Sequence, residues 1–167
     1  MGYVKDRFKE KADALGLEIK DIIAKHGNDK IGEVTVAQAY QGMRGIPGLI
    51  TETSLLDSEE GIRFRGYSIP ELRVQLPKAE GGTEPLPEGL FHLMLVGEMP
   101  SKEDVDHLSA VFARRSHVPN HVFATIEALP ASTHPMTQFC VAVLALQTES
   151  KFAKAYASGI SKKEYWD

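Results

Sequence analysis

The residue in this sequence best suited to chemistry is Arg44, because it lies in a glycine-rich segment. Gly42, Gly45 and Gly48 surround it, so the backbone there can approach a ligand closely. A guanidinium presents forked donors that match the oxygens of a phosphate. The segment fits neither the Walker pattern nor the dinucleotide-binding fingerprint. Taken alone, it predicts an anion site outside the standard nucleotide motifs.

The histidines and the single cysteine do not form a recognisable metal site or nucleophile. His117 and His121 have the i, i+4 spacing of helical metal ligands, but Pro119 between them breaks the helix that would bring them together. They are therefore predicted to be loop histidines. Cys140 lies in an apolar run, where a buried thiol is inert. His134 precedes a proline at an expected helix start, where capping or core packing is a commoner role than catalysis.

No nucleophile with a base and an orienting group, no paired-carboxylate motif and no metal cluster emerges from the sequence. His26, His92 and His107 have no partner that the pattern identifies, and Arg63 and Arg65 are expected to line the outer face of a hairpin. From the residues alone, this stretch therefore shows no complete active site and no metal site.

Composition limits the class of protein. The 167 residues carry 19 basic and 23 acidic side chains, and this net charge of −4 argues against a nucleic-acid-binding protein. One cysteine excludes an internal disulfide framework. The longest apolar run, residues 139–146, is too short to cross a bilayer, so no membrane partner is expected. The N-terminus has no apolar signal-peptide core, and its acidic residues are unlike a mitochondrial transit peptide.

Helical signals dominate the elements that must position these residues. An apolar stripe from Val4 to Ile23 predicts a helix closed near Gly27, and a capping box of Ser68 with Glu71 begins another. Alternation around Phe64, with Gly61 in the turn, predicts one hairpin. Further helices are expected over 35–40, 88–96, from 101 until Pro119, 120–129, 136–150 and 151–157. Thr35 and Asn120 are expected caps, Ser101 with Asp104 begins its helix, and Gly97 ends the helix before it. The expected fold class is all-α with one small β-hairpin.

The helix of residues 136–150 is apolar on every side between Phe139 and Leu146. A surface helix has a polar back, so this one must be enclosed all round. It is either the central helix of a monomeric core or a helix at a subunit interface, and the pattern alone leaves both open.

The last residues predict the start of a further helix. Ser161 and Glu164 have the spacing of a capping box, and Tyr165 and Trp166 would begin its buried face. We therefore expect the chain to be cut from something longer at Asp167, the alternative being a frayed tail with a chance match.

Several segments together resemble citrate synthase of the eukaryotic, mitochondrial type. The likeness runs in order along nearly the whole chain. It rests on YQGMRGIPG at 40–48, ETS at 52–54, DSEEGIRFRGYSI at 57–69, GGTEPLPEGLF at 81–91, HPM at 134–136, ES at 149–150 and FAKAY at 152–156.

The resemblance implies an enzyme of the mitochondrial matrix that condenses acetyl-CoA with oxaloacetate and releases citrate and CoA. Residues 1–167 would form the N-terminal portion of its large helical domain, with the catalytic and oxaloacetate-binding residues further along. It also implies a homodimer through the helix Met136–Ser150, no permanently bound cofactor, and CoA phosphate contacts from Arg44 and Lys162. The family usually has arginine where Lys162 stands, and lysine loses the bidentate geometry. Alternatives are a methylcitrate synthase segment and a non-catalytic helical dimerisation module.

Overall fold

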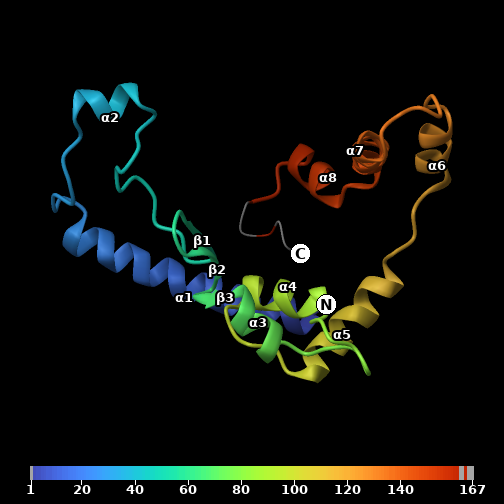
Figure 1. The fold of residues 1–167 in the computed structure, drawn as a ribbon, viewed down its shortest axis with the longest axis horizontal. Coiled ribbons are helices and arrows are strands. Elements are labelled where there is room, and N and C mark those ends of the chain that lie inside the picture. Colours follow the sequence, from blue (N-terminus) through green and yellow to red (C-terminus); the bar gives the residue numbers. More distant parts are fainter. Residues whose placement is uncertain (1, 162–163, 165–167) are drawn as a thin grey trace. The chain divides into compact units, whose positions relative to one another are not determined.

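The computed structural model describes residues 2–161 and 164. The chain divides into two compact units, Met1–Val111 and Phe112–Asp167. Figure 1 traces their elements along the chain. The described residues are mainly helical with one small sheet, as the sequence predicts.

The first unit is built on a long helix, α1 (Gly2–His26), which is followed by a short one, α2 (Val36–Tyr40). The strands β1 (Ser54–Asp57), β2 (Gly61–Phe64) and β3 (Tyr67–Ser68) form an antiparallel sheet in sequence order. Helices α3 (Ile69–Gln75), α4 (Pro87–Val96) and α5 (Lys102–Arg114) follow, the last extending just past the division between the units.

The sheet contains the predicted hairpin and one strand more. Gly61 has φ +90° in the turn, as expected for a hairpin, and Leu56 pairs with Ile62 across it. The added strand β3 pairs only two residues, Tyr67 and Ser68, with β2. It is too short to show a period-two pattern, so the sequence did not reveal it.

The predicted capping groups begin and end several helices. Ser68 and Glu71 form the expected capping box at α3, and Ser101 Oγ accepts a hydrogen bond from Asp104 N (3.1 Å) at α5. Gly97 ends α4 as predicted, with φ +80°, a left-handed conformation that glycine adopts readily.

The core of the first unit lies where α4 meets its neighbours. Figure 1 shows α4 beside α1, and ion pairs from Arg7 and Lys11 to Glu98 place the contact at the N-terminal half of α1. The most buried hydrophobic side chains of the described residues are Val4, Leu72, Leu76, Leu93, Val96, Val105, Leu108, Val111 and Val122, the last in the second unit.

The apolar stripe of α1 is covered only in part. Val4 is 4% exposed, whereas Ile19, Ile22 and Ile23, further along the same stripe, are 42%, 50% and 62% exposed. The helix is continuous through Gly16, which lies between these halves.

The second unit contains α6 (Asn120–Glu127), α7 (Pro135–Ala145), the 3₁₀ helix η1 (Leu146–Glu149) and α8 (Lys151–Ala157). Helices α6 and α7 pack against each other. Two predictions are wrong in detail. Asn120 is not a cap, because Pro119 takes the N-cap position and Asn120 is the first helical residue. The helix predicted to reach Ser150 ends as an α-helix at Ala145 and continues as 3₁₀ turns.

Candidate functional site

The segment around Arg44 is organised by the short helix α2. Thr35 is its N-cap, and its Oγ1 accepts a hydrogen bond from Gln38 N (3.2 Å). Gln38 Oε1 accepts in return from Thr35 N (3.0 Å), which completes a capping box. This reciprocal pair fixes where the helix begins. The helix has five residues, and the glycine-rich loop follows it.

The loop leaves α2 through a run of left-handed residues. Gly42, Met43 and Gly45 have φ of +77°, +64° and +72°. The two glycines adopt this conformation at little cost, but a residue with a Cβ, such as Met43, loses about 1–2 kcal/mol there. Met43 N donates to Gln38 O (2.8 Å), so a backbone hydrogen bond to α2 holds the strained residue that precedes Arg44.

The Arg44 side chain is exposed, and no carboxylate among the described residues lies within ion-pair distance of it. Its backbone is anchored, because Gln38 Nε2 donates to Arg44 O at 3.4 Å. A guanidinium that no acid neutralises, carried by a hydrogen-bonded loop, is suited to bind an anion such as a phosphate. The structure thus shows Arg44 exposed on a hydrogen-bonded loop, and its role in an anion site stays a prediction.

Thr35 is the cap that the sequence predicts, whereas Gln38 is not among the predicted residues. The T-x-x-Q spacing of residues 35–38 is itself a capping-box signal and would have identified it. The second predicted basic residue, Lys162, lies outside the described residues.

Arg65 does not line the outer face of the hairpin, so that prediction is wrong. Its side chain turns inward, where Nε and Nη2 donate to Met94 O (3.1 and 2.7 Å) and Nη1 donates to Glu52 O (3.3 Å). Its backbone has φ +49°, and Arg65 N donates to Thr53 O (2.7 Å). Arg65 therefore ties the segment that leaves the Arg44 loop to the C-terminal end of α4.

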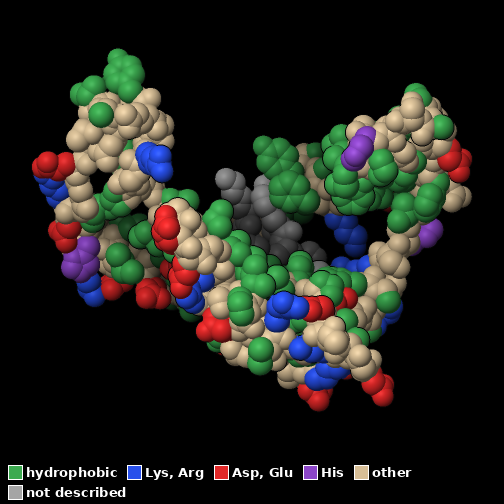
Figure 2. Space-filling view, in the orientation of Figure 1, with side chains coloured by type: hydrophobic (Ala, Val, Ile, Leu, Met, Phe, Trp, Pro, Cys, Tyr) green, Lys and Arg blue, Asp and Glu red, His purple; other side chains and the backbone are tan. Residues whose placement is uncertain are grey.

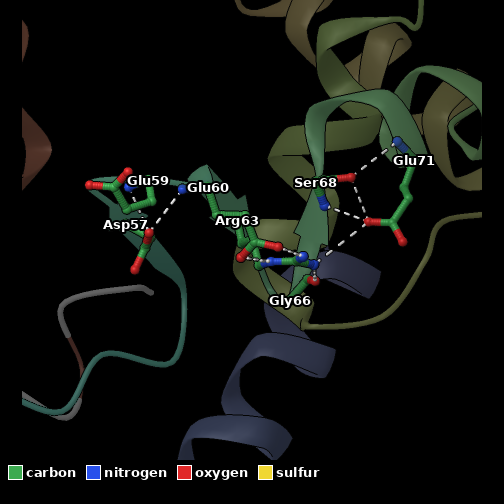
Figure 3. Close-up of polar contacts among 7 residues, drawn as sticks. All are labelled: Asp57, Glu59, Glu60, Arg63, Gly66, Ser68 and Glu71. Atoms are coloured by element: carbon green, nitrogen blue, oxygen red, sulfur yellow. Dashed lines mark hydrogen bonds and ion pairs between the residues drawn. The ribbon is translucent and has the colours of Figure 1, made fainter.

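Arg63 is occupied by contacts within its own segment (Figure 3). Its Nε donates to Glu60 Oε2 (2.9 Å) and its Nη1 to Gly66 O (2.9 Å), and Nη1 also lies 3.8 Å from Glu71 Oε2. The hydrogen bond from Arg63 lowers the pKa of Glu60, the Coulombic attraction adding to it. This guanidinium joins the hairpin turn to the cap of α3 and is not open to a ligand.

His121 and His134 have structural partners. His121 is in α6, not in a loop as predicted, and its Nε2 lies 3.0 Å from Ala145 O in the last turn of α7. His134 caps α7 by accepting from Met136 N (3.2 Å), the role expected for it. Within residues 2–161 and 164, no group of three or more His, Cys, Asp or Glu is placed to hold a metal ion.

His92 is the one buried polar side chain of the described core. It is 2% exposed on α4, and neither ring nitrogen has a hydrogen-bond partner there. Asp104 of α5 lies within its electrostatic reach. Burial raises the pKa of Asp104, but hydrogen bonds from Ser101 N–H and hydroxyl outweigh it, with His92 and Tyr3 adding to the net lowering.

The apolar helix α7 is not enclosed by the described residues. Phe139, Val143 and Leu144 are 61%, 51% and 74% exposed, and no residue of α7 is buried. Figure 2 shows hydrophobic surface gathered over this helix. The expectation that Cys140 is buried is likewise wrong, because its side chain is exposed. Each large apolar group left in water forfeits about 1.5–3 kcal/mol, so this face needs cover that the described residues do not provide.

No helix within the described ranges has the length and apolarity to cross a bilayer.

Comparison with known proteins identifies relatives over almost the whole chain. Residues 42–167 match the family model described as citrate synthase, C-terminal domain. The mitochondrial citrate synthase of Saccharomyces cerevisiae is 58% identical over 98% of this chain, and the peroxisomal citrate synthase of that yeast is 50% identical over the same share. The mitochondrial 2-methylcitrate synthase of Yarrowia lipolytica is 53% identical, again over 98%. The chain spans about a third of the length of these relatives (34%, 35% and 35%).

Proposed function

The chain belongs to the citrate synthase family, and we propose that it supplies the N-terminal portion of the large helical domain of a citrate synthase subunit. The reaction of such an enzyme joins acetyl-CoA to oxaloacetate and, with water, releases citrate and CoA. The part we assign to this chain is to bind CoA and to form subunit interface. The chemical step is assigned to residues outside it.

The Arg44 loop carries the CoA assignment. Its guanidinium has no described acidic partner, and the left-handed Met43 beside it is hydrogen-bonded to α2. When CoA binds, Arg44 would hold phosphate oxygens by charge-assisted hydrogen bonds and so orient the thioester end toward the rest of the subunit. Lys162 is proposed as a second, monodentate phosphate contact.

A CoA titration followed by NMR tests this assignment. Removal of charge-assisted hydrogen bonds costs about 1.5–3 kcal/mol, so Arg44→Ala is expected to weaken CoA binding about ten- to a hundredfold. Arg44→Lys keeps the charge and should fall between. Arg114→Ala removes an arginine from α5 and serves as the control. Equal affinities for Arg44→Ala and Arg114→Ala would refute the site.

We further propose that α7 forms a homodimer interface. The exposed apolar residues Phe139, Val143 and Leu144 support this, since they need cover that the described chain does not provide. Val143→Asp should convert a dimer to a monomer in light scattering, because a charge would be buried without a partner. Val74→Asp places the same substitution at an exposed position of α3. A compact monomer before mutation, or a dimer that tolerates Val143→Asp, would contradict the proposal.

The chain by itself is proposed to be inactive. Purified chain given acetyl-CoA and oxaloacetate should release no citrate and no free CoA, and CoA release above a blank would overturn this. A non-catalytic dimerisation module is the second candidate, favoured by the same exposed face of α7, and it predicts dimerisation with no CoA affinity.

The substrate and the compartment are proposed from the relatives' names. Identities of 58% to a citrate synthase and 53% to a 2-methylcitrate synthase lie close together, and acetyl-CoA is proposed over propionyl-CoA. The mitochondrial matrix is proposed as the location, with the peroxisome as the alternative suggested by the peroxisomal relative. Fractionation of cells expressing the tagged natural protein would distinguish the two compartments.

A further inference from the structure

We propose that Gln38 is a positioning residue for Arg44. Its side chain holds the arginine's carbonyl, and its main chain holds the preceding residue, Met43. The inference deepens the proposed function, on which its ligand-binding readout rests. Gln38 lies in the middle of α2, and five hydrogen bonds connect it to the cap before it and the loop after it.

The first step is the orientation of the Gln38 amide. Thr35 N–H can only donate and Arg44 C=O can only accept, so the side chain between them must present oxygen to one and nitrogen to the other. The amide therefore has one satisfactory orientation. A carboxylate could serve the cap but would repel the Arg44 carbonyl, and an apolar side chain could serve neither.

The second step is the backbone that this amide supports. Gln38 O accepts from Met43 N (2.8 Å), and Gln38 Nε2 donates to Arg44 O (3.4 Å). The two contacts bracket Met43 and Arg44, one of them a strained residue at φ +64°. Without the side-chain contact, the carbonyl of Arg44 would lose its only hydrogen bond from the described residues, and the peptide that joins it to Gly45 would be held only by the turn that Ile46 N closes on Met43 O (3.3 Å).

The third step is the consequence for the ligand. An exposed arginine samples many rotamers and loses conformational entropy when it binds a phosphate. A backbone that is not held in place adds to this loss. Gln38 reduces that loss by holding the Cα of Arg44 in one place. Its effect on CoA should therefore be smaller than that of Arg44 itself, since it removes no direct contact.

The test uses the whole 167-residue chain and two readouts. Gln38→Met keeps the length of the side chain but removes both polar atoms. Gln41→Met makes the same chemical change three residues along, where the described part of the chain offers the side chain no hydrogen-bond partner. The Gly45 amide resonance reports on the Arg44 carbonyl without any ligand, and a titration with CoA reports on binding.

Gln38→Met is expected to shift the Gly45 amide resonance and weaken CoA binding about two- to fivefold, the size of one neutral hydrogen bond. Gln41→Met should do neither. Gln38→Glu, which retains the cap, should also move the Gly45 resonance, which separates the loop contact from helix capping. A Gly45 resonance that is unchanged in Gln38→Met would overturn the inference. A shifted resonance with no effect of Arg44→Ala on CoA would instead overturn the CoA assignment and leave the positioning contact standing.

Discussion

Replacing Arg65 tests whether an inward-facing arginine holds the sheet to helix α4. Three of its guanidinium nitrogens donate to backbone carbonyls, two of them to Met94 O at the end of α4. A hydrogen bond from a charged donor contributes about 1.5–3 kcal/mol, and a cation at a helix C-terminus adds about 0.3–1 kcal/mol. Because the side chain is only half-buried, we expect Arg65→Ala to lower the free energy of unfolding by about 2 kcal/mol.

A second substitution at the same position separates contact from strain. Arg65 has φ +49°, and a Cβ in that conformation costs about 1 kcal/mol or more. Arg65→Gly loses the same hydrogen bonds but relieves this strain, so it should be about 1 kcal/mol more stable than Arg65→Ala.

Urea unfolding followed by far-ultraviolet circular dichroism measures both values. With a urea dependence of about 1–2 kcal/mol per molar for a domain of this size, Arg65→Ala should move the midpoint down by about 1–2 M. Equal midpoints for the alanine and glycine variants would refute the strain argument. Midpoints equal to that of the unmutated chain would refute the contact itself.

Two further predictions concern the same unit. Hydrogen bonds from Lys11 and Arg7 lower the pKa of Glu98 below its usual 4.5. The ionised Glu98 therefore stabilises the fold above pH 4.5, and this stabilisation is lost as the pH falls through the lowered pKa. Glu98→Gln should reduce the Tm at neutral pH, and the difference in Tm should vanish in acid. His92→Leu should change the free energy of unfolding by less than about 1 kcal/mol, because it removes a buried imidazole with no described hydrogen bond. Leu93→Ala, at the neighbouring buried position, should lower the free energy of unfolding by about 2–5 kcal/mol. Equal losses for the two variants in urea titrations would show that the imidazole has a partner.

Local chemistry made much of the fold predictable. The caps at Thr35, Ser68 and Ser101 each depend on residues within one turn, and Gly97 ends its helix through its own backbone freedom. These signals do not depend on what packs against the helix, so the sequence alone predicts the caps and the helix end correctly.

The errors arise where distant residues decide. Arg65 alternates with apolar neighbours, as an outward-facing strand residue would, but Met94, 29 positions along the chain, supplies the carbonyl that draws it inward. Cys140 was expected to be buried because its run is apolar, although apolar sequence shows only that cover is needed and not that this chain supplies it.

The candidate site was predictable in part for the same reason. An exposed loop around Arg44 was predictable from its glycines, which adopt left-handed conformations at Gly42 and Gly45, whereas the anion site itself stays a prediction. No sequence pattern indicates that Gln38 contacts Arg44, because its hydrogen bond with Arg44 O forms only once the loop has turned back on α2.

The partly covered apolar stripe of α1 predicts where trypsin should first cleave this helix. The segment from Leu17 to His26 has little tertiary packing, with Ile22 and Ile23 at least half exposed, and a helix of that length is marginal on its own in water. Gly16 adds a weak point, because glycine within a helix costs about 1 kcal/mol relative to alanine. Local opening should therefore begin beyond Gly16, and trypsin should cut after Lys20 or Lys25 before it reaches Lys11, whose ion pair with Glu98 holds the other half in place.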